Sequence, residues 1–245
     1  MTNDQKPVIS VRKLRKVYMM GQEHVVALHN IDLDIPRGEV CCIFGTSGSG
    51  KSTLLNQLAG LEKPTRGVVR IGGVPISRLN ENQLAAFRQK HIGFVFQSYN
   101  LLPELTAAEN VAMPLMFKGV DPDVRLLEAK KMLCRVGLKD RMDHFPNQMS
   151  GGQQQRVGIA RAFITQPEVV CADEPTGNLD TRTTKEVMHM IRGFAHRFHQ
   201  TIVLVSHDPE MTEYADRIVT LIDGRIVSNV ENQVKAEIDA APYIE

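Results

Sequence analysis

The chain has 245 residues, 42% of them hydrophobic and 23% charged, which is enough to bury one substantial α/β core. Its 29 lysines and arginines nearly balance its 28 aspartates and glutamates, so no basic surplus indicates nucleic-acid binding. Residues 1–7 are polar and lack the apolar segment of a secretory signal. No apolar run approaches the ~20 residues of a membrane span, so we expect any membrane function to depend on spans in another polypeptide.

The four cysteines form no C-x-x-C pair. Cys41, Cys42 and Cys171 lie in short apolar runs that are typical of buried strands, whereas Cys134 lies elsewhere. We therefore expect reduced, buried thiols of the kind found in cytosolic proteins.

Residues 8–18 and 25–35 alternate apolar and polar side chains and are separated by a turn around Gly21. This pattern predicts two antiparallel, half-exposed strands. Tyr18 closes the first strand, and its residue type fits either an aromatic that stacks on adenine or an ordinary strand aromatic.

Residues 45–52 fit the P-loop pattern G-x-x-x-x-G-K-[ST], between an apolar strand at 40–44 and a helix at 52–59 that Gly60 ends. The glycines let the backbone approach a polyphosphate, and the helix start favours an anion. Lys51 adds a cation for the β/γ-phosphates, and Ser52 can ligate Mg²⁺. A flexible turn that merely contains a lysine is the alternative, but the flanking strand and helix favour nucleotide binding. The predicted nucleotide-binding residues are Gly45, Thr46, Ser47, Gly48, Ser49, Gly50, Lys51, Ser52 and Thr53.

A short strand at 68–71 precedes Asn80, which is placed to cap a helix over 81–90. The apolar run 92–96 predicts a buried strand, and Gln97 follows at its carboxyl end, where open α/β sheets bind ligands. Helical spacing over 106–116, 124–136 and 150–164 predicts a helical subdomain inserted between strands of the core.

A second apolar strand, 169–172, ends in Asp173 and Glu174. In a P-loop protein Asp173 is placed to hold Mg²⁺ through water, and Glu174 to orient or deprotonate the attacking water. The alternative is a solvated acidic pair at a strand end, which the P-loop in the same chain makes less favoured.

The remainder of the chain predicts further alternation of helices and strands. We expect a helix over 181–199, a strand over 201–205 followed by His207, and a short helix from Pro209. A hairpin pairs 217–222 with 225–227, and the polar tail 229–245 is expected to form at most a loose helix.

Ser150, Gly151, Gly152 and Gln153 form a second helix start with glycines and a hydroxyl. One nucleotide does not need two such sites in one subunit. A head-to-tail dimer resolves this, with each Ser150 segment closing over the γ-phosphate held by its partner's P-loop. A helix-capping serine with turn glycines is the alternative.

Six motifs occur in an order that resembles the ATPases of ATP-binding cassette (ABC) transporters. They are the P-loop, Gln97, the segment Met149–Gln153, Asp173 with Glu174, Asp180 and His207. The resemblance covers about residues 8–227. It implies that Tyr18 stacks on adenine, that Gln97 contacts Mg²⁺ and the attacking water, that Asp180 contacts the dimer partner, and that His207 senses the γ-phosphate. Met149 departs from the usual leucine, an apolar exchange that preserves packing.

The fold implied is that of an α/β P-loop NTPase, with a RecA-like core around a mainly parallel sheet and an N-terminal antiparallel β subdomain. One ATPase domain is expected over 1–230, with the core and β subdomain in 1–97 and 166–230, the helical subdomain in 98–165, and a tail from 231 to 245.

The run from Glu174 to Asp180 is similar to the lipoprotein-releasing, macrolide-exporting and cell-division group. This resemblance implies ATP and Mg²⁺ as ligands, a second copy and a transmembrane permease as partners, no nucleic acid, and a location at the cytoplasmic face of the membrane. A regulatory division-type ATPase that signals without cargo remains an alternative. Soluble DNA-repair or translation ATPases fit poorly, because the chain has neither long coiled-coil insertions nor two cassettes.

The resemblance also implies that a short helix of the permease docks beside Gln97. Apolar residues close to it are candidates for that groove, with Tyr99 and Leu102 favoured over residues that also fit the subdomain core. The full set is Tyr99, Leu101, Leu102, Met113 and Met116.

Overall fold

A computed structural model describes residues 6–232 of the chain. The described part of the chain divides into two compact units. The described residues of the first unit are 6–88 and 201–232, and those of the second are 89–200.

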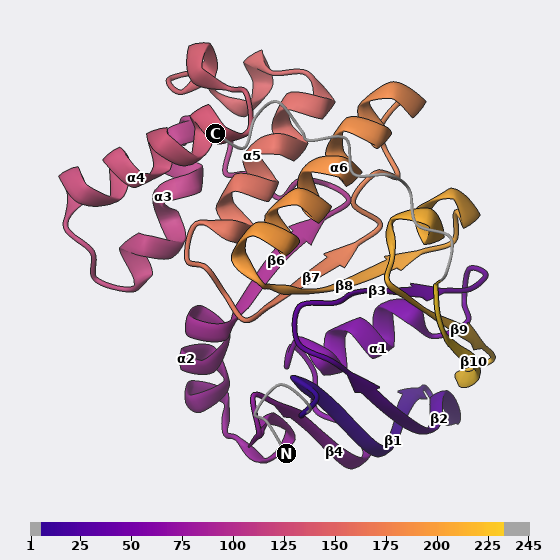
Figure 1. Ribbon diagram of the computed structural model, residues 1–245. Coiled ribbons are helices and arrows are strands. Elements are labelled where there is room, and N and C mark those ends of the chain that lie inside the picture. The colour runs from indigo at the N-terminus through magenta and orange to yellow at the C-terminus, as the bar shows by residue number, and fades with distance from the viewer. Residues whose placement is uncertain (1–5, 233–245) are drawn as a thin grey trace. The chain divides into compact units, whose positions relative to one another are not determined.

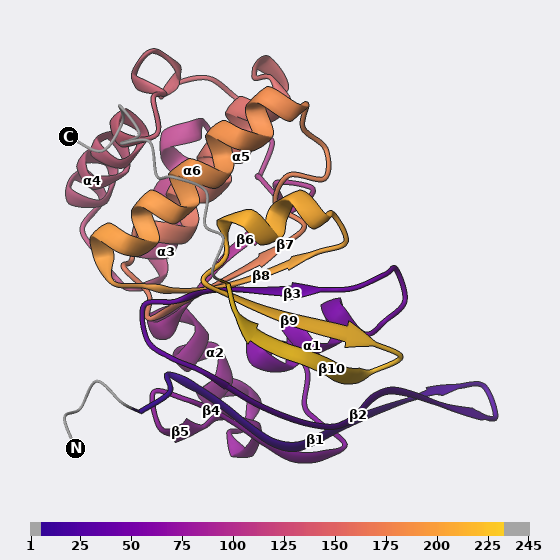
Figure 2. The ribbon, with the colours of Figure 1, turned by 45° about the vertical axis from the view of Figure 1, so that its right-hand side comes forward.

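The first unit contains an antiparallel sheet in the order β2-β1-β4-β5. The predicted strand pair is confirmed, although β1 runs beyond Tyr18 and ends in a hairpin that extends past the rest of the sheet (Figure 2). The two-residue strand β5 was not predicted, because it is too short to show alternation. The bounds of these strands are β1 (Ile9–Met20), β2 (Glu23–Ile35), β4 (Arg66–Ile71) and β5 (Val74–Pro75).

Strands β10, β9, β3 and β8 lie side by side in that order in the same unit. β3 runs parallel to both β8 and β9, whereas β10 pairs antiparallel with β9. Their bounds are β3 (Val40–Phe44), β8 (Thr201–Ser206), β9 (Arg217–Ile222) and β10 (Arg225–Glu231).

The last strand is longer than predicted, because β10 continues to Glu231, whereas the sequence suggested a loose helix from 229. The rest of that predicted tail lies outside the described residues. The predicted short helix at Pro209 is a 3₁₀ helix, η5 (Pro209–Tyr214).

Helix α1 (Lys51–Leu58) lies between the antiparallel sheet and the group of strands that contains β3 and β8. It packs against β2, β4 and β8 (Figure 2). Leu54, Leu55 and Leu58 of this helix are buried. The P-loop helix is therefore held by strands on both of its sides. The 3₁₀ helix η2 (Ile76–Arg78) follows β5, and helix α2 (Glu81–His91) ends just inside the second unit. Asn80 caps α2 as predicted, since its Oδ1 accepts the Gln83 amide at 2.9 Å.

In the second unit β6 (Ile92–Phe96) and β7 (Val169–Asp173) form a parallel pair. The chain between them is helical, as predicted, and α5 and α6 run side by side (Figures 1 and 2). Phe163 of α5 and Phe194 of α6 are fully buried with ring centres 5.1 Å apart. The helices are α3 (Ala107–Phe117), α4 (Pro122–Arg135), η3 (Lys139–Arg141), η4 (Pro146–Gln148), α5 (Gly151–Phe163) and α6 (Thr181–Phe198).

The fold is that of an α/β P-loop NTPase, with parallel strands, an N-terminal antiparallel sheet and an inserted set of helices. Cys41, Cys42 and Cys171 are buried as expected, Cys134 is exposed, and all four are free thiols. Among the helices of residues 6–232, none has both the length and the apolar character that crossing a membrane requires.

Candidate functional site

The P-loop leaves β3 at Phe44 and enters α1 at Lys51. Two of its glycines are required sterically. Gly50 has a φ of 99°, and a Cβ there would lie 2.6 Å from the Ala27 carbonyl oxygen. A Cβ at Gly45 would overlap the Leu221 carbonyl oxygen. The loop therefore follows a path that side chains at these positions would block.

A turn from the far end of the sequence holds the loop in place. The Gly224 amide, in the turn between β9 and β10, donates to the Ser49 carbonyl at 2.9 Å. The Gly224 carbonyl in turn accepts the His29 amide from β2 at 2.8 Å. Three distant segments of the first unit thus fix one loop conformation.

The loop fits a polyphosphate. α1 has no side-chain cap at its N-terminus and no acidic residue in its first turn, so its first amides face no competing carboxylate. The Ser49 hydroxyl is buried with no hydrogen-bond partner, and Lys51 is only 5% exposed. The Lys51 ammonium donates to the Thr46 carbonyl at 2.7 Å, which keeps its charge at the loop. A buried unpaired hydroxyl beside a confined cation is an arrangement that a phosphate would complete.

Tyr18 is half-buried on β1 and is held by a charged cluster. Its hydroxyl donates to Glu62 at 2.7 Å, and the Lys16 ammonium lies 4.9 Å from its ring centre. Burial, together with the Glu62 contact, raises the pKa of Tyr18, while a hydrogen bond from the Thr53 hydroxyl opposes that rise. The hydroxyl of the ring is therefore held by Glu62.

Glu62 joins this cluster to α1. Although partial burial acts the other way, hydrogen bonds from Tyr18, Lys16 and Asn56 hold the pKa of Glu62 below its ordinary value. The Asn56 amide of α1 donates to it at 3.1 Å, and the Lys16 ammonium lies 3.0 Å from it. Sequence reasoning missed this cluster, because Lys16 and Glu62 are separated by the whole P-loop.

His207 follows β8 and is exposed. Because Phe44 of β3 and Ser206 of parallel β8 are register partners, His207 and the P-loop leave the sheet at the same edge. The first unit thus brings the P-loop and His207 to one edge and ties Tyr18 to α1.

In the second unit the parallel register pairs Phe96 of β6 with Asp173 of β7. Gln97 and Glu174 therefore emerge together at the carboxyl ends of these strands. Glu174 is half-buried and has a φ of 42°, in the left-handed region that a non-glycine residue adopts only when its surroundings impose it. The left-handed backbone conformation at Glu174 therefore sets the direction in which its carboxylate leaves the chain.

The expected Mg²⁺ ligands are Ser52, Asp173 and Gln97. Over residues 6–232 no three His, Cys, Asp or Glu side chains converge to hold a metal ion by themselves. Ser52 belongs to the first unit and Asp173 and Gln97 to the second. Their donor types, a hydroxyl, a carboxylate and an amide oxygen, suit Mg²⁺, which is bound through one or two carboxylates together with substrate phosphates and water rather than in an all-protein cage.

The segment Met149–Gln153 opens α5 through a capping box. The Ser150 hydroxyl accepts the Gln153 amide at 3.3 Å, and the Gln153 side chain accepts the Ser150 amide at 3.0 Å. Ser150 is exposed and Met149 is buried. Ser150 therefore caps α5, and its side chain remains at the surface of the unit.

The glycines of this segment also serve packing. A Cβ at Gly151 would lie 2.7 Å from the Tyr99 hydroxyl, and one at Gly152 would lie 2.6 Å from a methyl group of Thr183. Glycine at these two positions thus allows the side chains of Tyr99 and Thr183 to approach the start of α5 closely.

Asp180 caps α6, because its carboxylate accepts the Thr183 amide at 3.0 Å and the Thr183 hydroxyl at 2.7 Å. These bonds hold the pKa of Asp180 below its usual value. The carboxylate lies at the surface of the second unit.

The apolar residues beyond Gln97 separate into two kinds. Tyr99 packs its hydroxyl on Gly151, and its carbonyl accepts the buried Arg161 guanidinium at 2.8 Å. Leu102 and Met116 are 43% and 44% exposed. Leu102 and Met116 are therefore the more accessible surface, and Tyr99 is largely part of the packing.

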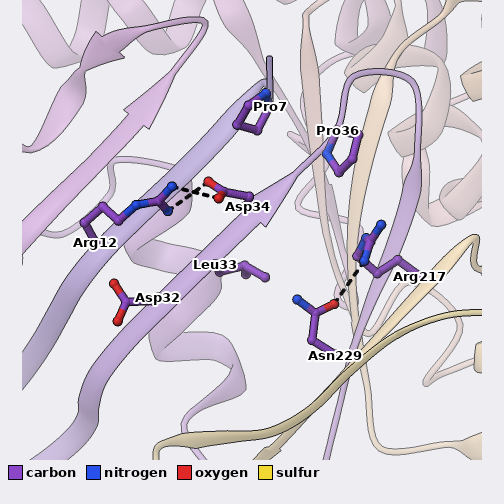
Figure 3. A pocket seen from close by; sticks show the side chains of 8 residues that line it. All are labelled: Pro7, Arg12, Asp32, Leu33, Asp34, Pro36, Arg217 and Asn229. Atoms are coloured by element: carbon purple, nitrogen blue, oxygen red, sulfur yellow. Dashed lines mark hydrogen bonds and ion pairs between the residues drawn. The ribbon is translucent and has the colours of Figure 1, made fainter. Parts of the chain in front are cut away.

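A pocket of about 590 Å³ lies elsewhere in the first unit (Figure 3). Its charged groups already have partners within the protein: Arg12 makes a two-pronged pair with Asp34, at 2.8 and 2.7 Å, Arg217 bonds Glu39 and Asn229, and Asp32 accepts the Lys13 amide at 2.9 Å. Side chains that already satisfy each other present little for a ligand, so this pocket is not the candidate site.

Comparison with known proteins agrees with this geometry. The family described as "ABC transporter" matches residues 28–177. An "Uncharacterized ABC transporter ATP-binding protein" of Thermotoga maritima is 48% identical over 221 residues, which are 90% of this chain and 94% of that protein. The "Macrolide export ATP-binding/permease protein MacB" of Escherichia coli strain K12 is 45% identical over 91% of this chain. The chain spans only 34% of that macrolide exporter.

A solved structure, "Dimeric structure of a post-hydrolysis state of the ATP-binding cassette MJ0796 bound to ADP and Pi", is similar with a TM-score of 0.85 and 40% identity. The match covers 91% of this chain and 98% of that one.

Proposed function

The chain belongs to the ABC transporter ATP-binding family, and from this premise we propose that it is the ATP-hydrolysing subunit of a transporter whose membrane spans lie in a separate permease. The observation that supports ATP binding most directly is the P-loop, with its buried, unpaired Ser49 hydroxyl and confined Lys51. Residues 1–230 act as one ATPase domain in this proposal, with the core and β subdomain in 1–97 and 166–230 and the helical subdomain in 98–165.

Nucleotide binding is assigned to the first unit. Tyr18 stacks on the base, the loop amides from Gly45 to Gly50 bind the phosphates, and Lys51 neutralises the β/γ-phosphate charge. Ser52 and Thr53 are the last residues of the P-loop segment that binds the phosphates of the nucleotide. The Tyr18 hydroxyl bond to Glu62 supports this role, because it fixes the ring plane before a base arrives.

Hydrolysis is assigned to Glu174, Gln97 and His207. Glu174 accepts a proton from the attacking water as the water oxygen bonds to the γ-phosphorus and the bond to the β–γ bridging oxygen breaks. Gln97 orients that water, and His207 contacts the γ-phosphate. Mg²⁺, held by Ser52, Asp173 and Gln97, supplies positive charge to the phosphates.

The active assembly in this proposal is a head-to-tail dimer of two copies around two ATP molecules. Ser150, Gly151, Gly152 and Gln153 of one copy cover the γ-phosphate held by the other, and Asp180 contacts the partner. The similar cassette MJ0796 is dimeric in a post-hydrolysis state with ADP and phosphate bound, which supports a dimer.

The transporter is of the export type, for a lipoprotein, macrolide or peptide cargo, and the chain lies at the cytoplasmic face of the membrane through its permease. The similarity to the macrolide export ATP-binding/permease protein, which joins ATP-binding and permease functions, supports a permease partner. Coupling ATP hydrolysis to transport makes the complex a translocase.

Two substitutions test the proposal by separating binding from hydrolysis. Lys51→Ala removes the phosphate cation, and calorimetry should show weakened ATP binding together with lost turnover. Glu174→Gln keeps shape but removes the base, so ATP binding should persist while turnover falls by about two orders of magnitude or more. Wild-type turnover in Glu174→Gln would remove Glu174 from the mechanism, and unchanged ATP affinity in Lys51→Ala would overturn the phosphate site.

A further inference from the structure

The turn that follows Glu174 is anchored from two directions within the second unit. The Gly177 amide donates to the Glu174 carbonyl at 3.1 Å and closes the turn. On one side, the fully buried Gln155 of α5 donates to the Pro175 carbonyl at 2.5 Å. On the other side, the turn contacts Gln97. The left-handed backbone of Glu174 is thus held by its neighbours.

The contact with Gln97 has two parts. The Asn178 side-chain amide donates to the Gln97 carbonyl at 3.0 Å. Gly177 lies against the Gln97 side chain, where an added Cβ would come within 2.6 Å of Nε2 and 3.2 Å of Cδ. Gly177 is not among the residues with positive φ, so glycine here provides space and not a special backbone conformation: an added methyl group would displace the end of the Gln97 side chain.

We propose that Gly177 and Asn178, which we call the Gln97 seat, are positioning residues that hold Gln97 against the turn of Glu174. The positions of the glutamine and of the catalytic carboxylate are thereby fixed relative to each other. This inference rests on the proposed ATPase roles of Gln97 and Glu174. Asn178 fixes the glutamine backbone, and Gly177 leaves the space in which its carboxamide lies.

The seat also gives the loop beyond Gln97 a direct route to Glu174. Residues 98–105 carry the exposed Leu102 side chain and directly follow Gln97, whose carbonyl accepts the Asn178 amide. A displacement of that loop therefore acts on the turn of Glu174 through one hydrogen bond and one steric contact. Both seat residues are exposed, so neither is part of the core that stabilises the unit.

Gly177→Ala is the decisive substitution. The new methyl group is compatible with the backbone but must push the Gln97 carboxamide aside by about 1 Å, and a misplacement of this size costs up to about 100-fold in rate. We expect kcat to fall about 10- to 100-fold, the ATP KM to stay within about twofold, and the Mg²⁺ concentration for half-maximal rate to rise. Gly158→Ala is the matched control, because a Cβ there meets its nearest atoms at ordinary contacts of 3.7 and 3.9 Å.

A double-mutant cycle separates positioning from a purely structural effect. In a Gln97→Ala background no carboxamide remains to be displaced, so Gly177→Ala should have no further effect on kcat. Equal losses from Gly177→Ala in both backgrounds would overturn the proposal. Asn178→Asp provides a second variant, since it keeps the size of the side chain but cannot donate to the Gln97 carbonyl; we expect faster amide exchange over residues 97–100 and a lower kcat.

The outcomes also distinguish this inference from the proposed function. Wild-type activity in Gln97→Ala would overturn the role of Gln97 and the seat with it. If Gln97→Ala lowers kcat while Gly177→Ala and Asn178→Asp retain wild-type kcat, the ATPase assignment stays intact and only the proposed role of the Gln97 seat is overturned. Melting temperatures within about 2 °C of wild type confirm that the variants fold.

Discussion

The Lys16 ammonium covers the Tyr18 ring at 4.9 Å while the Tyr18 hydroxyl donates to Glu62 at 2.7 Å. A cation beside an aromatic face is favourable, and here the same cation also pairs with Glu62 at 3.0 Å. The ring is thereby held at its hydroxyl by Glu62 and covered on one face by Lys16, so in the proposed role a base stacks on the opposite face.

The first prediction concerns the base. Tyr18→Ala removes the stacking surface and should weaken ATP binding about tenfold, because base–aromatic stacking contributes ~1–3 kcal/mol. Tyr18→Phe keeps the ring and serves as the control, with affinity within about threefold. Inorganic triphosphate has no base, so calorimetry should show equal affinity for it in all three proteins. Loss of triphosphate binding in Tyr18→Ala would show instead that the residue supports the P-loop.

The second prediction concerns the dimer. With ATP bound and hydrolysis blocked by Glu174→Gln, light scattering should show a dimer holding two nucleotides. Adding Ser150→Arg places bulk and charge at the exposed start of α5 and should return the protein to monomer. Val124→Arg, at an equally accessible position on α4, controls for the added cation and should still dimerise. A Ser150→Arg protein that dimerises with ATP would place the contact elsewhere.

The third prediction concerns the permease. The Leu102 side chain is exposed, while its amide and carbonyl bond the buried Asn110 side chain at 2.8 and 3.0 Å. Leu102→Glu therefore changes the surface but not the loop. ATP hydrolysis by the isolated chain should stay within about twofold, and co-purification with the proposed permease should be lost.

Leu127→Glu is the matched control for that experiment, since Leu127 is 55% exposed on α4 of the same unit. Retained co-purification in Leu102→Glu would move the docking surface away from this loop, whereas loss in both variants would show that it extends over α4.

The fourth prediction concerns the thiols. Burial raises the pKa of Cys42 and of Cys171 to about 12, and Cys41 is shifted in the same direction, so these groups stay protonated and shielded at neutral pH. Exposed Cys134 should react alone with a thiol reagent in the native protein, and all four should react in denaturant. Cys134→Ser should abolish the fast phase. More than one fast thiol at neutral pH would contradict the packing of β3 or β7.

The local patterns of the sequence determined much of the fold. Strands β3 and β6 begin and end where their apolar runs do, and Asn80, Thr106 and Ser150 cap the helices that follow them. Apolar runs and caps depend on neighbouring residues, so one chain segment suffices to specify them. The order of the P-loop, Gln97, Ser150 and Glu174 along the chain likewise indicates the family from the sequence alone.

The tertiary structure alone decided what surrounds those residues. Glu62 reaches Tyr18 across 44 positions of sequence, Gly224 pins Ser49 from near the end of the chain, and Gly177 makes room for Gln97. None of these contacts leaves a periodic or spacing signal, because each depends on how distant strands and turns come together in the folded chain. The sequence by itself therefore determined which residues carry the proposed chemistry, and packing decided which neighbours hold them in place.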